Sequence, residues 1–168
     1  MIAGAAGAGG LGLAAVPVAG LVAGPAHTAS PFGASQRGAD AGWTEVARLD
    51  DLHVGEAVQV AVMGQEIDAW SVTPARRIGA VWLLREGEGA ETVKALSAVC
   101  PHLGCLIERR GDGFNCPCHV SAFAHDGRAM EGPSPRAMDP IEVRVRDGAV
   151  QVKWVRYRLG VSERVVEG

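Results

Sequence analysis

The stretches "CPHLGC", residues 100–105, and "CPCHVSAF", residues 116–123, contain all four cysteines of the 168-residue chain and two of its five histidines. Only a short segment separates them. Thiols and imidazoles are the side chains that bind transition metals most readily, so this concentration predicts a metal centre. The rest of the chain must then supply a fold that holds these two stretches together.

Six side chains in the two stretches are more ligands than one tetrahedral ion needs. They are Cys100, His102, Cys105, Cys116, Cys118 and His119. Structural zinc sites normally use paired C-x2-C or H-x3-5-H spacings, and neither thiol pair has that spacing. Each stretch offers a cysteine with a histidine two or three residues later, which would suit a cluster of two irons with different ligands. A zinc site and a disulfide-only arrangement remain the alternatives.

These residues resemble the two cluster-binding boxes of Rieske iron-sulfur proteins, whose general form is C-x-H-x-G-C followed by C-x-C-H-x-S. The segment "GPSP", residues 132–135, resembles the proline loop that shields the cluster in that family. In Rieske centres two histidines replace two cysteines on one iron, which raises the reduction potential. The resemblance implies a [2Fe-2S] cluster as the cofactor.

The resemblance also implies a ligand set. Cys100 and Cys116 are expected to bind the buried iron, because thiolates suit the ferric site. His102 and His119 are expected to bind the outer iron and to leave their other ring nitrogens facing solvent. The acidity of an exposed imidazole rises when its iron is oxidised, so the two histidines are the expected quinol-facing catalytic residues.

A disulfide between Cys105 and Cys118 is implied by the resemblance as well, and two free buried thiols are the alternative. Such a bond would join the two loops that hold the cluster. It persists only outside the reducing cytoplasm. The disulfide therefore predicts an exported domain.

Further residues are expected to shield or tune the cluster. They are Ser121, Phe123, Leu103, Gly132, Pro133 and Pro135. Ser121 should donate a hydrogen bond to a cluster sulfur, whereas Phe123 stands where many high-potential members carry tyrosine and has no hydroxyl to donate. The potential should therefore lie below the top of the Rieske range of about −150 to +300 mV, which favours menaquinol over ubiquinol. Leu103 is expected at the apolar tip, with packing beneath the proline loop as the alternative.

Short runs rich in β-branched and aromatic residues follow one another from Trp43 onward. They are residues 56–63, 67–73, 79–86 and 92–100. The clearest signal is "IEVRVRDGAVQVKW", residues 141–154, where alternating apolar residues flank an Asp-Gly pair that suits a type I′ turn. The strand pattern predicts an all-β fold. The resemblance implies the Rieske fold of antiparallel, sandwich-like sheets, with a cluster-binding subdomain at about 98–136.

The N-terminal stretch, residues 1–26, has no ionisable side chain and is long enough to span a bilayer as a helix. It predicts an uncleaved membrane anchor, with a cleavable signal helix as the alternative. Residues 27–42 are mostly Pro, Ala, Gly and Ser without an apolar period, so they predict a flexible tether. The Rieske domain is expected over residues 43–168.

The charge balance excludes one class of partner. With 16 basic against 19 acidic side chains, no excess of cations is available for a phosphate backbone, so nucleic acid is not expected. Anchor, tether and disulfide-bearing head together resemble the Rieske subunit of a respiratory-chain, cytochrome bc-type quinol:cytochrome c reductase.

This second resemblance implies an oxidoreductase subunit that is active only within its complex. It would accept an electron and a proton from quinol and pass the electron to a c-type haem. Cytochrome b and a c-type cytochrome would be its partners, in a bacterial inner membrane with the cluster domain on the periplasmic side. The small subunit of an arsenite oxidase-like molybdoenzyme is the main alternative, and an electron-transfer or assembly module without a catalytic partner is the third.

Overall fold

The structure is a computed structural model and describes residues 42–64 and 74–167. The expected anchor, nearly all of the tether and the expected strand at 67–73 lie outside the described residues. The described strands are β1 (Trp43–Arg48), β2 (Ala57–Gly64), β3 (Arg76–Arg85), β4 (Val93–Ser97), β5 (Glu108–Arg110), β6 (Gly113–Cys116), β7 (Ser121–Phe123), β8 (Ala129–Glu131), β9 (Pro140–Arg146), β10 (Ala149–Lys153), β11 (Arg156–Tyr157) and β12 (Val166–Glu167). Two short 3-10 helices, η1 (Leu49–Asp51) and η2 (Ala90–Thr92), complete the described elements.

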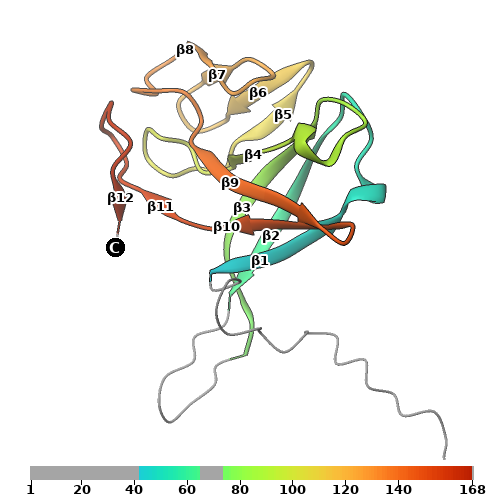
Figure 1. Cartoon of the computed structure of the whole chain (residues 1–168). Coiled ribbons are helices and arrows are strands. Elements are labelled where there is room, and N and C mark those ends of the chain that lie inside the picture. Colours follow the sequence, from blue (N-terminus) through green and yellow to red (C-terminus); the bar gives the residue numbers. More distant parts are fainter. Residues whose placement is uncertain (1–41, 65–73, 168) are drawn as a thin grey trace, which may run out of the picture. The chain divides into compact units, whose positions relative to one another are not determined.

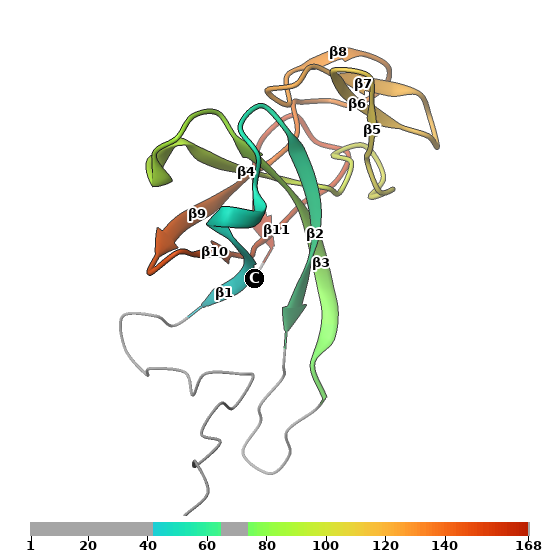
Figure 2. The ribbon, with the colours of Figure 1, turned by 90° about the vertical axis from the view of Figure 1, so that its right-hand side faces the viewer.

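The strands form three sheets, and the named strands in them pair antiparallel. A six-stranded sheet has the order β1-β10-β9-β4-β3-β2, a four-stranded sheet has the order β5-β6-β7-β8, and β11 pairs with β12. The four-stranded sheet stands beyond one end of the larger sheet in both views (Figures 1 and 2). The all-β prediction, with a main sheet and a small subdomain, is therefore confirmed.

Strand β3 is buried on both faces, which explains its continuous apolar run "GAVWLL". Val81 and Leu83 belong to one apolar core, with residues of β4, β9 and β10. Trp82 and Leu84 point the other way, into a second core that contains Phe114 of the small sheet. The second core therefore joins the two sheets, and it contains two of the cysteines.

The β9–β10 hairpin forms where the sequence predicts it. Asp147 and Gly148 have φ values of 51° and 75°, as a type I′ turn requires at both central positions. The strand expected at residues 92–100 is shorter, because β4 ends at Ser97 and only an isolated bridge between Val99 and Leu106 continues the pairing. None of the helices within residues 42–64 and 74–167 has the length and apolarity that crossing a bilayer requires.

Candidate metal centre

Loop 1, residues 100–105, folds back on itself directly after the isolated bridge. The N–H of Cys100 donates to the Cys105 carbonyl at 2.8 Å, and the N–H of Gly104 donates to the Cys100 carbonyl at 2.9 Å. Gly104 has φ +82°, in the left-handed region that favours glycine. These bonds hold both cysteines of the loop and the histidine between them on one compact turn.

Loop 2, residues 116–121, connects β6 to β7 in the small sheet. Cys116 ends β6 and pairs with Ser121, which begins β7, so the intervening residues form a tight hairpin connection. Val120 has φ 53°, a left-handed conformation that is strained for a β-branched residue. The hairpin brings the histidine of loop 2 close to that of loop 1.

The two loops bring together two buried thiols and two imidazoles. Cys100 and Cys116 are each 1% exposed, and neither forms a disulfide. Burial raises the pKa of the Cys100 thiol to about 11, because a thiolate without a positive partner is costly in an apolar core. The rings of His102 and His119 meet edge to face with centroids 4.8 Å apart, and the His119 side chain is the more exposed.

A disulfide between Cys105 and Cys118 joins loop 1 to loop 2, with the two Cα atoms 6.5 Å apart. The Sγ atoms of this pair and of Cys116 lie within 4.8 Å of one another. Since the disulfide uses two of these three sulfurs, only the Cys116 thiol among them is available as a metal ligand. The disulfide therefore lies next to the Cys116 thiol and fixes the distance between the two loops.

The donor set fits a two-iron cluster. In the described part of the chain, the Nδ1 atom of His102 is one of two buried side-chain polar atoms without a hydrogen-bond partner. A buried imidazole nitrogen without a partner is unfavourable, and iron would satisfy it together with two buried thiols that are not in a disulfide. The residues present therefore match the mixed cysteine and histidine ligation of a Rieske centre.

A sequence profile of the Rieske [2Fe-2S] domain matches residues 42–151. The chain belongs to the Rieske [2Fe-2S] domain family. The cofactor of this Rieske domain is accordingly a [2Fe-2S] cluster. The match ends before the last strands of the described chain, which lie beyond the conserved family profile.

Several curated Rieske proteins resemble parts of the chain. The cytochrome b6-f complex iron-sulfur subunit of Chlorobaculum tepidum is 36% identical over 63 residues, which are 36% of this chain and 35% of that protein. The menaquinol:cytochrome c reductase iron-sulfur subunit of Bacillus subtilis is 34% identical over 89 residues, 49% of this chain and 50% of that protein. The matches thus span half or less of the length of these curated relatives.

One solved structure is similar to part of the chain. The cyanobacterial plasma membrane Rieske protein from Synechocystis PCC 6803 is 26% identical to this chain, with a TM-score of 0.40. The match covers 56% of this chain and 86% of that one.

The proline loop of the Rieske domain, residues 132–135, packs directly on loop 2. Gly132 has φ +91°, and a Cβ atom placed on it would lie 2.5 Å from the Cα of Ser121. The N–H of Ser134 donates to the Ser121 hydroxyl oxygen at 3.1 Å, which leaves the Ser121 O–H free to donate elsewhere. The close approach explains why glycine is needed at position 132.

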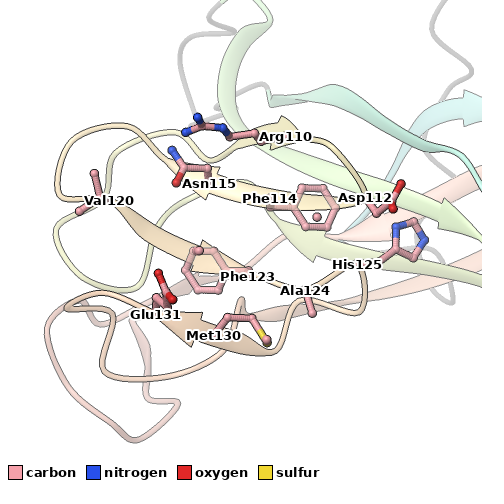
Figure 3. A pocket seen from close by; sticks show the side chains of 12 residues that line it. Arg110, Asp112, Phe114, Asn115, Val120, Phe123, Ala124, His125, Met130 and Glu131 are labelled. Carbon is pink, nitrogen blue, oxygen red and sulfur yellow. The ribbon is translucent and has the colours of Figure 1, made fainter.

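Phe123 lies in the wall of a cavity of about 660 Å³ on the small sheet (Figure 3). Phe114 and His125 line the same cavity, with their rings stacked at 6.4 Å between centroids. Phe123 also belongs to the buried core that contains Cys100 and Cys116. The structure therefore places a ring without a hydroxyl in the same core as the two thiols.

Leu103, which was expected at an apolar tip or packed beneath the proline loop, is 60% exposed. Val120 of loop 2 is 71% exposed, so each loop presents one apolar side chain next to its histidine. Sequence reasoning missed a buried ion pair between Arg136 and Asp139, immediately after the proline loop. Its only sequence signal is opposite charge at a spacing of three residues, which surface pairs share.

Proposed function

We propose that this protein is the Rieske subunit of a bc-type quinol:cytochrome c reductase. In this role it accepts an electron and a proton from quinol and passes the electron to a c-type haem. The observation that carries the proposal is a pair of adjacent imidazoles on the same two loops as two buried thiols, with a disulfide that joins the loops. Two relatives of the chain are iron-sulfur subunits of the cytochrome b6-f complex and of a menaquinol:cytochrome c reductase, which supports the same role.

The proposed ligands divide by burial. Cys100 and Cys116 would hold the inner iron, because their thiols are sealed from water and neither is in a disulfide. His102 and His119 hold the outer iron, and the partnerless Nδ1 atom of His102 is the natural ligand atom of that ring. When bound, the cluster supplies a one-electron acceptor.

The histidines supply the proton site in this proposal. The second nitrogen of a ring bound to oxidised iron would lose its proton more readily, and in that deprotonated form it would accept a hydrogen bond from quinol and then the proton itself. His119 is the more exposed of the two rings and is the better placed for this contact. The imidazole would then take the proton and the cluster that it binds would take the electron. The two acceptors are neighbours, which avoids separating charge in an apolar pocket.

Leu103 and Val120 are the proposed docking residues. Both are largely exposed apolar side chains, and each follows a proposed histidine ligand by one residue. Their apolar surface suits the apolar pocket in cytochrome b where quinol would bind. An electron relay to a molybdenum subunit would need no such contact with quinol.

Menaquinol is the proposed substrate. Phe123 has no hydroxyl to stabilise the reduced cluster, which lowers the expected potential and suits a lower-potential quinol. The Bacillus subtilis relative is named as a menaquinol:cytochrome c reductase subunit.

Residues 1–26 are proposed to anchor the protein in a bacterial inner membrane, with the cluster domain on the periplasmic side. Residues 27–42 are proposed to be a tether that lets the domain swing between cytochrome b and a c-type haem. Shortening residues 28–40 should leave the cluster intact and slow turnover of the complex. Unchanged turnover would contradict a moving head.

The proposal is tested by purifying the complex from native membranes and measuring quinol-dependent reduction of cytochrome c. A tight partner with b-type haem supports the proposal, whereas co-purification of a molybdenum subunit supports the arsenite oxidase-like alternative. Leu103→Asp should lower quinol-dependent turnover and leave the cluster potential nearly unchanged. Val54→Asp, at another exposed apolar residue outside both loops, is the matched control and should retain full turnover. Equal turnover in the two variants would refute the docking role of Leu103.

A further inference from the structure

The C-terminal segment, residues 156–167, lies beyond the part of the chain that the Rieske profile matches, yet it returns to the metal centre. Its strands β11 and β12 pair with each other, and the N–H of Arg158 donates to the Val165 carbonyl at 2.8 Å. The segment is therefore a closed hairpin with its own hydrogen bonds. In Figure 1 it runs down the side of the domain that carries loop 1.

The segment contacts loop 1 on both sides of the proposed ligand His102. The N–H of Gly160 donates to the carbonyl of Pro101 at 2.8 Å. A Cβ atom placed on Gly104 would lie 2.9 Å from Leu159 Cδ1, so Leu159 packs closely against that glycine. Pro101 and Gly104 lie on either side of His102. They are held by Gly160 and Leu159, which are neighbours in the C-terminal segment.

Arg136 fixes the part of the segment that makes these contacts. Its guanidinium donates to the carbonyl of Arg158 at 2.9 Å and to the carbonyl of Val161. These two carbonyls bracket residues 159–160, which touch loop 1. Two further bonds of 2.8 Å tie the guanidinium to both carboxylate oxygens of Asp139, and the two side chains are only 5% and 4% exposed.

The ion pair is itself anchored to the other parts of the metal centre. The N–H of Ser97, at the end of β4, donates to the Asp139 carbonyl at 2.7 Å. The Ser134 hydroxyl donates to the Arg136 carbonyl at 2.8 Å, while the Ser134 N–H bonds to Ser121 of loop 2. The Arg136–Asp139 pair therefore links three parts of the fold: its backbone carbonyls accept from the main sheet and the proline loop, and the Arg136 guanidinium bonds the C-terminal segment.

We propose that the C-terminal segment is a brace for loop 1 and that Arg136 is its positioning residue. The brace holds the backbone on both sides of His102, so that the imidazole stays where a metal ligand must be. This inference rests on the proposed ligand set, because only then does the position of His102 affect cluster retention. Arginine is required, since a lysine ammonium cannot bond bidentately to Asp139 and also reach two carbonyls.

Hydrogen exchange of the full chain tests the brace directly. The amides of Cys100 and Gly104 both donate within loop 1 and report its opening. Arg136→Lys should accelerate exchange of both amides at least about tenfold, and the holoprotein should lose iron to a chelator correspondingly faster. Unchanged exchange in loop 1 would overturn the proposal.

Arg85→Lys is the matched control. Arg85 is also a largely buried arginine, and it donates to four backbone carbonyls, those of Leu49, Leu52, Gly87 and Glu88. All of these partners lie outside both cluster loops, so the control should destabilise the fold while leaving loop 1 exchange and iron retention unchanged. Equal acceleration in Arg85→Lys and Arg136→Lys would show that Arg136 supports only general stability, and this would also overturn the proposal.

Gly160→Ala is a milder variant that keeps the test decisive if Arg136→Lys does not fold. Gly160 has φ +71°, and a Cβ atom there would meet no atom closer than the His102 carbonyl oxygen at 3.7 Å. Its effect is therefore backbone strain alone, and loop 1 exchange should rise about three- to tenfold. No rise in this variant refutes the brace. A wild-type protein that binds no cluster would refute the proposed function instead, because loop 1 exchange can be measured without iron.

Discussion

Replacing Gly132 with alanine is expected to separate the proline loop from loop 2. The residue has φ +91°, and a left-handed conformation costs a non-glycine residue roughly 1–2 kcal/mol. The new Cβ would also lie 2.5 Å from Ser121 Cα and 2.9 Å from the Val120 carbonyl oxygen, and backbone atoms cannot rotate away. Such overpacking typically costs about 1–3 kcal/mol. Gly132→Ala should therefore lower the free energy of unfolding by about 2–5 kcal/mol.

The same substitution should also make the cluster labile. Moving the proline loop breaks the hydrogen bond from Ser134 to Ser121 and opens the metal centre to water. Gly55→Ala is a matched control, because Gly55 has φ +81° and no atom within 4 Å of its Cβ position. The control should lose only about 1–2 kcal/mol from backbone strain and should retain its cluster.

Denaturant unfolding of the full chain, followed by circular dichroism, measures both stability losses. The rate of iron release to a chelator measures cluster retention in the same samples. Equal stability losses in the two alanine variants, with equal iron release, would refute the argument that the proline loop is seated by a close approach at Gly132.

Three further predictions concern other residues. Phe123→Tyr should raise the midpoint potential by about 40 to 60 mV and Ser121→Ala should lower it similarly, because a hydrogen bond worth about 1 to 1.5 kcal/mol more in the reduced state shifts a one-electron couple by that amount. An unmoved midpoint in protein-film voltammetry would count against this tuning. Burial raises the pKa of Tyr157, the single tyrosine, so its phenolate absorbance should titrate above pH 10 in the folded protein. Its contribution to stability is present below about pH 10 and is lost as the pH rises through the folded pKa, and a midpoint at or below 10 would be inconsistent. Alkylation should label Cys105 and Cys118 only after reduction, and labelling without reductant would exclude the disulfide.

Local sequence signals predicted the elements that depend on neighbouring residues. Asp147-Gly148 imposes its own turn geometry, so the hairpin was predictable without knowledge of the rest of the fold. The cysteines and histidines of the two boxes were equally visible, because metal chemistry restricts residue types strongly. The clustering of these side chains is therefore readable from the chain itself.

Contacts between distant residues could not be predicted in the same way. Arg136 and the carbonyl of Arg158 are 22 positions apart, and nothing in either segment marks the pairing. The two-sided burial of β3 also depends on where the small sheet packs, so its run of apolar residues indicates burial and not the partner on each face. The brace at loop 1 emerges only from the assembled fold.

The backbone conformation of Val120 is a further feature that the sequence does not predict. Val120 has φ 53°, in the left-handed region that favours glycine. The backbone angle shows that loop 2 keeps a conformation suited to glycine despite the valine, at a cost in local strain.

Low-temperature EPR of the dithionite-reduced protein, combined with iron and sulfide analysis, tests the central claim most directly. The proposed ligand set predicts two irons and two sulfides per chain and a rhombic signal with a low average g. His102→Ser and His119→Ser should each abolish that signal, while His53→Ser, at an exposed histidine outside both loops, should keep it. A normal signal in either ligand variant, or no two-iron signal in the unaltered protein, would contradict the account.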